Sequence, residues 1–157
     1  MVVVLNFVLG IGFGLLLHEL PAIEEAPLAL HPAGAEIVSP YNHVQEHQIS
    51  VEDGRVVIQL EGQDVRWSKY TNSNSMDQTL DEGHNGIEVV PRSTDEIHVG
   101  DIVAFTYNSN LVVHRVVEIG TDEQGWYAET KGDNNQHTDP GKRRFEDIER
   151  LTVAIIF

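Results

Sequence analysis

The chain has 157 residues, 41% of them hydrophobic, which suits one folded domain with an appendage and argues against wholesale disorder. It contains no cysteine, which excludes disulfides, thiolate metal sites and cysteine nucleophiles. With 25 acidic against 10 basic residues the formal net charge is -15. A surface this acidic repels phosphate, so a nucleic-acid partner is not expected.

Residues 1–17 are almost wholly apolar, with Asn6 as the only polar side chain. As a helix this run spans about 26 Å, close to the ~30 Å thickness of a bilayer's hydrocarbon core. We interpret it as a single transmembrane signal anchor, with a cleaved signal peptide or a buried core helix as alternatives. Four of the six prolines fall within residues 18–42, which predicts an extended linker before a domain at 43–157.

The rest of the chain predicts a mostly β domain. A hairpin is expected over Gln48–Val51 and Arg55–Leu60, on either side of the turn signal Glu52-Asp53-Gly54. Further strands are expected at Gly86–Val90, Asp101–Tyr107, Leu111–Ile119, Trp126–Lys131 and Leu151–Phe157. No convincing long helix interrupts them, so a β-sandwich or barrel-like domain with short linking helices is predicted.

A candidate nucleophile lies in the polar stretch 71–80, which contains Ser73 and Ser75. Serine in a polar turn is ordinarily structural, and it becomes a nucleophile only with a base within hydrogen-bond reach. The candidate base is His114, which shares one strand face with Val112 and Val116. An imidazole among valines is partly desolvated and accepts protons near neutral pH, although a structural histidine is the alternative.

Two carboxylates are candidates for orienting His114. Asp133 lies in the tight turn Lys131-Gly132-Asp133-Asn134-Asn135, and Asp139 follows six positions later. A carboxylate beside an imidazole sets its tautomer and stabilises its protonated form. The sequence leaves the choice between the two aspartates open.

Four segments, in this order, resemble the sequence boxes of the signal peptidase I family. They span about half of the chain, roughly residues 71–139, and each alone is a weak signal. The four are Ser-Asn-Ser-Met-Asp at 73–77, Gly-Asp-Ile-Val at 100–103, Val-His-Arg-Val at 113–116 and Lys-Gly-Asp-Asn-Asn at 131–135. Bacterial members have lysine as the base, so histidine at 114 resembles the archaeal and endoplasmic-reticulum branch.

This resemblance implies a membrane-bound serine endopeptidase that removes signal peptides from secretory preproteins. It makes Ser75 the nucleophile of an acyl-enzyme and His114 the general base, with Asp133 and Asp139 as the carboxylates near the base. It implies a single-pass membrane protein in contact with lipid, with its catalytic domain on the extracytoplasmic side. The substrate is then a preprotein or peptide.

The resemblance also assigns supporting roles. The Ser75 N–H, helped by the Ser73 hydroxyl, is expected to stabilise the oxyanion, and Asp101 of the Gly-Asp-Ile-Val segment is a supporting residue. No cofactor and no metal are implied. Lys131 is a rival base, but it lies outside the base-bearing strand, where a surface lysine before a turn is the ordinary interpretation.

Two departures from the family pattern support another function. Asn74 replaces the family's glycine and Gln78 replaces its proline, so a catalytically weak or inactive peptide-binding relative is the main alternative. A LexA-like self-cleaving protein is a further one. It is disfavoured because it requires a lysine base and a DNA-binding module.

One motif indicates different chemistry. His43-Val44-Gln45-Glu46-His47 matches the His-x-x-Glu-His pattern of some zinc peptidases. That chemistry needs both histidines on one helix face and a third ligand further along the chain. Between Pro40 and the β-like residues 48–51 there is room for about one helical turn, so zinc catalysis is disfavoured.

Overall fold

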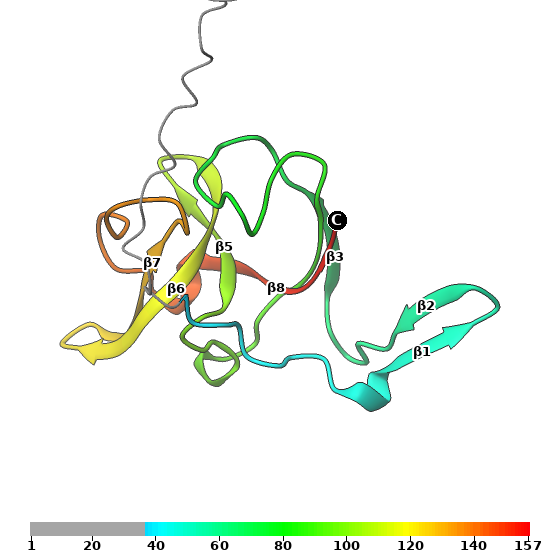
Figure 1. Cartoon of the computed structure of the whole chain (residues 1–157). Helices are drawn as coiled ribbons and strands as arrows, with labels where there is room; N and C mark the ends of the chain where they lie inside the picture. Colours follow the sequence, from blue (N-terminus) through cyan, green and yellow to red (C-terminus); the bar gives the residue numbers. More distant parts are fainter. Residues whose placement is uncertain (1–36) are drawn as a thin grey trace, which may run out of the picture. The chain divides into compact units, whose positions relative to one another are not determined.

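The computed structural model describes residues 37–157 (Figure 1). The transmembrane helix expected at 1–17, and the linker as far as residue 36, lie outside the described residues. Within residues 37–157, no helix is long and apolar enough to cross a membrane.

This part of the chain is mostly β, as predicted, and its strands pair antiparallel in two sheets. The helical content consists of short 3-10 turns, η1 (Glu46–Gln48), η2 (Thr94–Glu96) and η3 (Phe145–Asp147). The strands are β1 (Ile49–Glu52), β2 (Arg55–Ile58), β3 (Val65–Lys69), β4 (Asn85–Val89), β5 (Ile102–Tyr107), β6 (Asn110–Asp122), β7 (Gly125–Lys131) and β8 (Ile148–Ile156).

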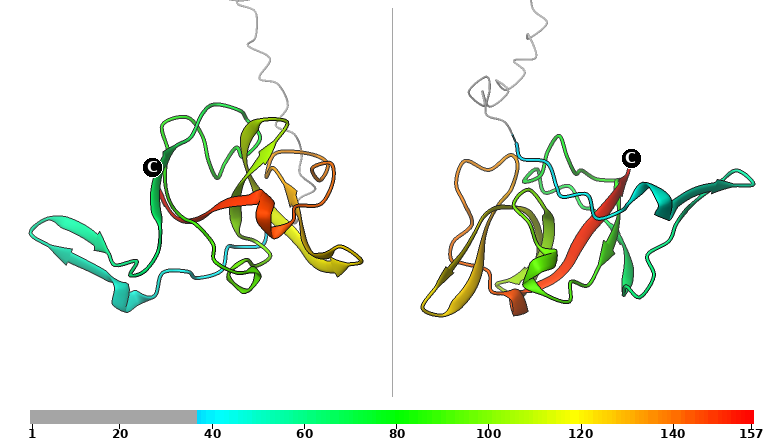
Figure 2. Two further views of the ribbon diagram at one scale, coloured as in Figure 1. Left: turned by 180° about the vertical axis from the view of Figure 1, so that it is seen from behind. Right: turned by 90° about the horizontal axis from the view of Figure 1, so that it is seen from below.

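The larger sheet has six strands in the order β3-β4-β8-β5-β6-β7. The smaller sheet is the β1–β2 hairpin, which extends away from the six strands in each view (Figures 1 and 2). Its predicted turn is confirmed, with Glu52 paired to Arg55 and positive φ at Asp53 and Gly54. Positive φ at two successive residues is typical of a type I′ turn, whose twist matches that of the two strands it connects.

Several strand boundaries differ from the prediction by a few residues, and one strand was not predicted at all. Strand β3 was not anticipated, because it is a short edge strand whose Val65 and Trp67 side chains are exposed, so no buried apolar face marks it. Strand β8 begins at Ile148 rather than Leu151, because η3 delivers Ile148 directly into pairing with Phe105 of β5.

The hydrophobic core has two parts. The larger cluster packs the central strands around Phe105, Val116 and Leu151. The smaller cluster combines Ile102 of β5 with residues of the loop between β3 and β4, namely Tyr70, Met76 and Leu80. The second cluster therefore packs the loop that carries Ser75 against the sheet.

Residues 37–43, here called the strap, run along the loop before β5. The sequence predicts a linker as far as residue 42, whereas residues 37–42 contact the domain and belong to the same compact unit. The Val38 carbonyl accepts a hydrogen bond from Arg115 Nη1 (3.3 Å), and the Tyr41 N–H donates to Asp101 Oδ1 (2.9 Å). Gly100 allows this approach, because it has a φ of 100° and a Cβ there would overlap the Ser39 carbonyl oxygen.

We predict that Gly100→Ala lowers the free energy of unfolding by about 2–4 kcal/mol in urea denaturation, through backbone strain plus displacement of the strap. Gly62→Ala is the matched control, since Gly62 has a φ of 71° and open space where a Cβ would lie. That control is expected to lose only about 1 kcal/mol. Equal losses in the two variants would show that the strap does not pack against Gly100.

Candidate active site

Ser75 and His114 line the same cavity, which has a volume of about 290 Å³. Its walls come from the loop between β3 and β4 and from the start of β6, segments that lie at one end of the domain in Figure 1. The lining is largely apolar, with hydroxyls and the imidazole as its polar groups. The lining residues are Tyr70, Thr71, Ser73, Ser75, Met76, Leu80, Leu111, Val112, Val113 and His114.

The ring of His114 is buried and held from behind by Asp139. His114 Nδ1 lies 2.7 Å from Asp139 Oδ2, and the Thr130 hydroxyl donates to the same oxygen at 2.7 Å. Burial raises the pKa of Asp139, but the hydrogen bonds from His114 and Thr130 outweigh it and leave the pKa below its ordinary value. An ionised Asp139 favours the tautomer with the proton on Nδ1, which leaves Nε2 as the proton acceptor.

Asp133 has a different partner. It receives a bidentate pair from Arg115, with Nε to Oδ1 at 2.8 Å and Nη2 to Oδ2 at 2.7 Å. The Thr79 hydroxyl donates to Asp133 Oδ2 at 2.6 Å. Burial raises the pKa of Asp133, but hydrogen bonds from Arg115 and Thr79 and the nearby positive charge bring it below its ordinary value.

Side chains alternate between the two faces of β6, which explains why the two aspartates have different partners. Adjacent residues of a strand point to opposite faces, so His114 and Arg115 on β6 reach different carboxylates. Of the two candidates, Asp139 is therefore the one in contact with the imidazole. Asp133 instead fixes Arg115 and the loop of Ser75.

The turn of Ser75 is held by the segment 132–134. The Asn134 N–H donates to the Ser75 carbonyl (2.9 Å), and Asn134 Nδ2 donates to the Asn74 carbonyl (2.9 Å). A Cβ at Gly132 would lie only 2.5 Å from the Ser75 oxygen, so glycine is needed for this approach. Because the 74–75 peptide is planar, anchoring its carbonyl also fixes the direction of the Ser75 N–H, which has no acceptor within residues 37–157.

The backbone of this turn accounts for the two departures from the family pattern. Asn74 has a φ of 58° and Gln78 a φ of 75°, both in the left-handed region. Asparagine tolerates that conformation better than most residues, so Asn74 replaces glycine at modest cost. Proline has a φ fixed near −65°, so it cannot occupy position 78 in a turn of this shape.

The Ser75 hydroxyl lies 3.1 Å from the Ser73 hydroxyl, and the two are hydrogen bonded. Among the described residues, this is the hydrogen bond made by Ser75 Oγ; none joins it to His114. A nucleophile–base pair would require the Ser75 hydroxyl to turn from Ser73 toward His114.

The remaining predicted residues lie elsewhere. Asp101 is fully buried in the loop before β5 and accepts from the backbone N–H groups of Tyr41 and His98. Lys131, the rival base, does not line the cavity. The His-x-x-Glu-His segment forms only the three-residue turn η1, with His47 exposed, so it lacks the helix face that zinc peptidase chemistry needs.

Three supporting residues escaped sequence reasoning. Thr79 and Thr130 each donate to one of the aspartates, and Tyr70 forms a wall of the cavity. Burial raises the pKa of Tyr70 to about 12, and its ring occupies the space where Gly86 has no Cβ. The Gly86 position was a signal, since a glycine inside a predicted strand often marks a close approach by another group.

Comparisons of the chain with protein-family models, with curated proteins and with solved structures found no match.

We predict that Asp133→Ala lowers the free energy of unfolding by about 3–5 kcal/mol at neutral pH, because Arg115 is left buried without its carboxylate. The folded-state pKa of Asp133 is lowered, so the stabilisation exists above the ordinary carboxyl pKa and is lost as pH falls through the folded-state value. The difference from the wild type should narrow below about pH 4.

The matched control for that experiment is Asp64→Ala, which removes the exposed Asp64–Arg66 pair. Its expected cost is below about 1 kcal/mol, since exposed ion pairs contribute little. Urea denaturation at several pH values measures both variants. A loss for Asp133→Ala as small as that of the control would contradict the structural role given to Asp133.

Proposed function

We propose that this chain is a serine endopeptidase of the signal peptidase I kind, with a signal peptidase-like β domain. The single observation that carries the proposal is the common cavity of Ser75 and His114, with Asp139 hydrogen bonded to the far side of the imidazole. The resemblance of the four sequence boxes supports the same assignment, because the boxes that contain Ser75 and His114 meet at this cavity. The fold by itself is not evidence for this function.

In this proposal the Ser75 hydroxyl attacks the scissile carbonyl, and His114 Nε2 takes its proton as the carbon–oxygen bond forms. Asp139 keeps Nδ1 protonated and stabilises the imidazolium that results. The imidazolium then gives its proton to the leaving amine. The amine departs, and the acyl group stays bonded to Ser75. Water, deprotonated by the same histidine, hydrolyses that ester.

The oxyanion of each tetrahedral intermediate requires donors that are in place beforehand. The Ser75 N–H is one candidate, oriented by the hydrogen bonds that Asn134 makes to the Asn74 and Ser75 carbonyls. The Ser73 hydroxyl, 3.1 Å from Ser75 Oγ, is the second. Removing one such donor typically costs about 10²–10³-fold in rate.

The substrate class follows from the walls of the cavity together with the resemblance. Tyr70, Leu80 and Val113 give the cavity an apolar surface, which suits a small uncharged side chain next to the scissile bond. An extended peptide held by main-chain hydrogen bonds would present such side chains alternately. A preprotein whose signal peptide lies in the membrane fits this class, with residues 1–17 as the enzyme's own anchor and the domain on the extracytoplasmic side.

A peptide-binding relative without catalysis is the second candidate. The observation in its favour is that Ser75 Oγ is hydrogen bonded to Ser73 rather than to His114. In that case the cavity binds a peptide and releases it uncut.

The test is cleavage of a preprotein by the detergent-solubilised full chain. Ser75→Ala and His114→Ala are each expected to reduce the rate by at least about 10³-fold. Asp139→Asn is expected to reduce it by about 10²–10⁴-fold through loss of the correct tautomer, with little change in KM.

Ser50→Ala, in hairpin strand β1 and outside the cavity lining, is the matched control and should keep full activity. Cleavage that survives both Ser75→Ala and His114→Ala would refute the proposal. Peptide binding without cleavage by any version would support the second candidate.

A further inference from the structure

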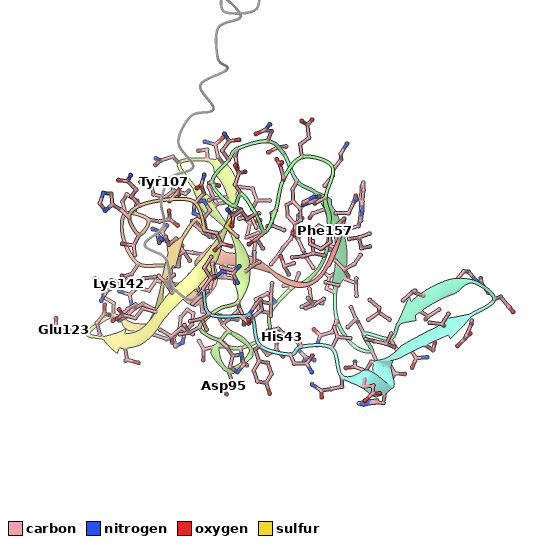
Figure 3. All side chains as sticks on the ribbon, in the orientation of Figure 1. His43, Asp95, Tyr107, Glu123, Lys142 and Phe157 are labelled. Atoms are coloured by element: carbon pink, nitrogen blue, oxygen red, sulfur yellow. The ribbon has the colours of Figure 1, made fainter. Side chains whose placement is uncertain are left out.

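The strap brings a second group of polar side chains together, and none of them lines the Ser75 cavity. His43, at the end of the strap, meets His98 and Asp101 from the loop before β5. Figure 3 labels His43 well below Tyr107, the residue that ends β5. The group is separate from the proposed catalytic residues in that His43, His98 and Asp101 are absent from the lining of the Ser75 cavity.

The three side chains point their ligand atoms at one another. His43 Nε2 lies 2.9 Å from Asp101 Oδ1, and His98 Nδ1 lies 3.6 Å from Asp101 Oδ2. One ligand atom from each of the three residues can be chosen so that all three lie within 4.8 Å of one another. Ligands around a tetrahedral zinc ion, each about 2.0–2.2 Å from the metal, are separated by about 3.3–3.5 Å. Small side-chain adjustments therefore produce a zinc geometry.

Two features of the group favour a cation. His98 Nδ1 is buried and has no hydrogen-bond partner among the described residues. The Asp101 carboxylate is fully buried, and in residues 37–157 no lysine or arginine pairs with it. Burying an unpartnered nitrogen costs free energy. The charge of Asp101 is met by hydrogen bonds from the Tyr41 and His98 N–H groups and from the His43 ring. A divalent cation would give the His98 nitrogen a partner and balance the charge of the carboxylate.

The surroundings hold the ligands in place. The Tyr41 N–H donates to Asp101 Oδ1 and the His98 N–H to Oδ2 at 2.8 Å. Once His43 binds the metal rather than Oδ1, each carboxylate oxygen has a lone pair for the same ion. The Tyr41 ring stacks on His98, with centroids 4.1 Å apart and planes 12° apart. Such contacts outside the ligand set orient the ligands and strengthen metal binding.

Space for a fourth ligand adjoins His43. A cavity of about 110 Å³ is lined by His43, Gln63 and Glu96, and Gln63 Oε1 is buried without a hydrogen-bond partner among the described residues. Zinc with three protein ligands takes a water molecule as the fourth. The Gln63 oxygen is an acceptor available on that side.

We propose that His43, His98 and Asp101 form a binding site for one divalent transition-metal ion, of which Zn²⁺ is the natural candidate given two imidazoles and a carboxylate. The ion fastens the strap to the loop before β5. This site differs from the zinc peptidase motif, because His47 takes no part in it. It is independent of the proposed peptidase function and departs from the expectation that the chain binds no metal.

The test is a titration of the chelator-treated full chain with ZnCl₂, followed by calorimetry and thermal unfolding. We expect one ion per chain and a Tm that rises with zinc, since an ion that binds only the folded state stabilises it. His98→Gln and His43→Gln should weaken binding by at least tenfold and reduce the rise in Tm. His47→Gln, which changes an exposed histidine, is the matched control and should bind like the wild type.

A second measurement needs no variant. In the ¹⁵N-edited spectrum of the wild-type chain, zinc should shift the ring nitrogens of two histidines strongly and leave the others unchanged. Equal zinc affinity in His98→Gln and His47→Gln, or ring shifts spread over all the histidines, would mean adventitious surface binding and overturn the proposal. Absence of binding in the wild type would overturn it as well.

Discussion

The buried pair of Arg115 and Asp133 connects the parts of the chain that build the candidate active site. Arg115 binds Asp133 through two nitrogens, and its remaining terminal nitrogen donates to the Gly100 and Val38 carbonyls. Asp133 in turn accepts from Thr79, in the loop that carries Ser75. One guanidinium thus joins β6, the strap, the loop before β5 and, through Asp133, the loop that carries Ser75. Its planar fork provides several fixed donors, which lysine could not replace.

This arrangement assigns separate tasks to neighbouring residues of β6. Arg115 holds the framework on one face, and His114 faces the cavity from the other, with Asp139 behind its ring. The position of Ser75 relative to His114 therefore depends on a buried ion pair outside the proposed chemistry. Breaking such a pair leaves a buried charge uncompensated, so damage there should alter both stability and the geometry of the site.

Much of the fold could be read from the sequence, because β-branched alternation and turn residues are local signals. The hairpin turn at Asp53 and Gly54 is one example, and the long strand β6 is another. Strand β3 could not be read, since its exposed Val65 and Trp67 give no buried face. The start of β8 at Ile148 was missed because it depends on pairing with Phe105, which is distant in sequence.

The candidate site, like the fold, could be predicted from the sequence only in part. The motifs named Ser75, His114 and two aspartates, but only three-dimensional pairing could decide which aspartate contacts the imidazole. That decision depends on strand direction at His114 and on the hydroxyl of Thr130. The strap was equally hidden, because Pro40 and its neighbours have the composition of a linker. Its attachment depends on Gly100, whose role is visible only from the carbonyl that approaches it.

Detection of the covalent intermediate tests the central claim, nucleophilic catalysis by Ser75, most directly. With an activated ester of a small-residue peptide, hydrolysis of the acyl-enzyme becomes the slow step, so the intermediate accumulates. Acid quenching and peptide mass spectrometry should then find one acyl group per chain, on Ser75, and none in Ser75→Ala. Turnover of the ester with no adduct, or an adduct that persists in Ser75→Ala, would contradict the account.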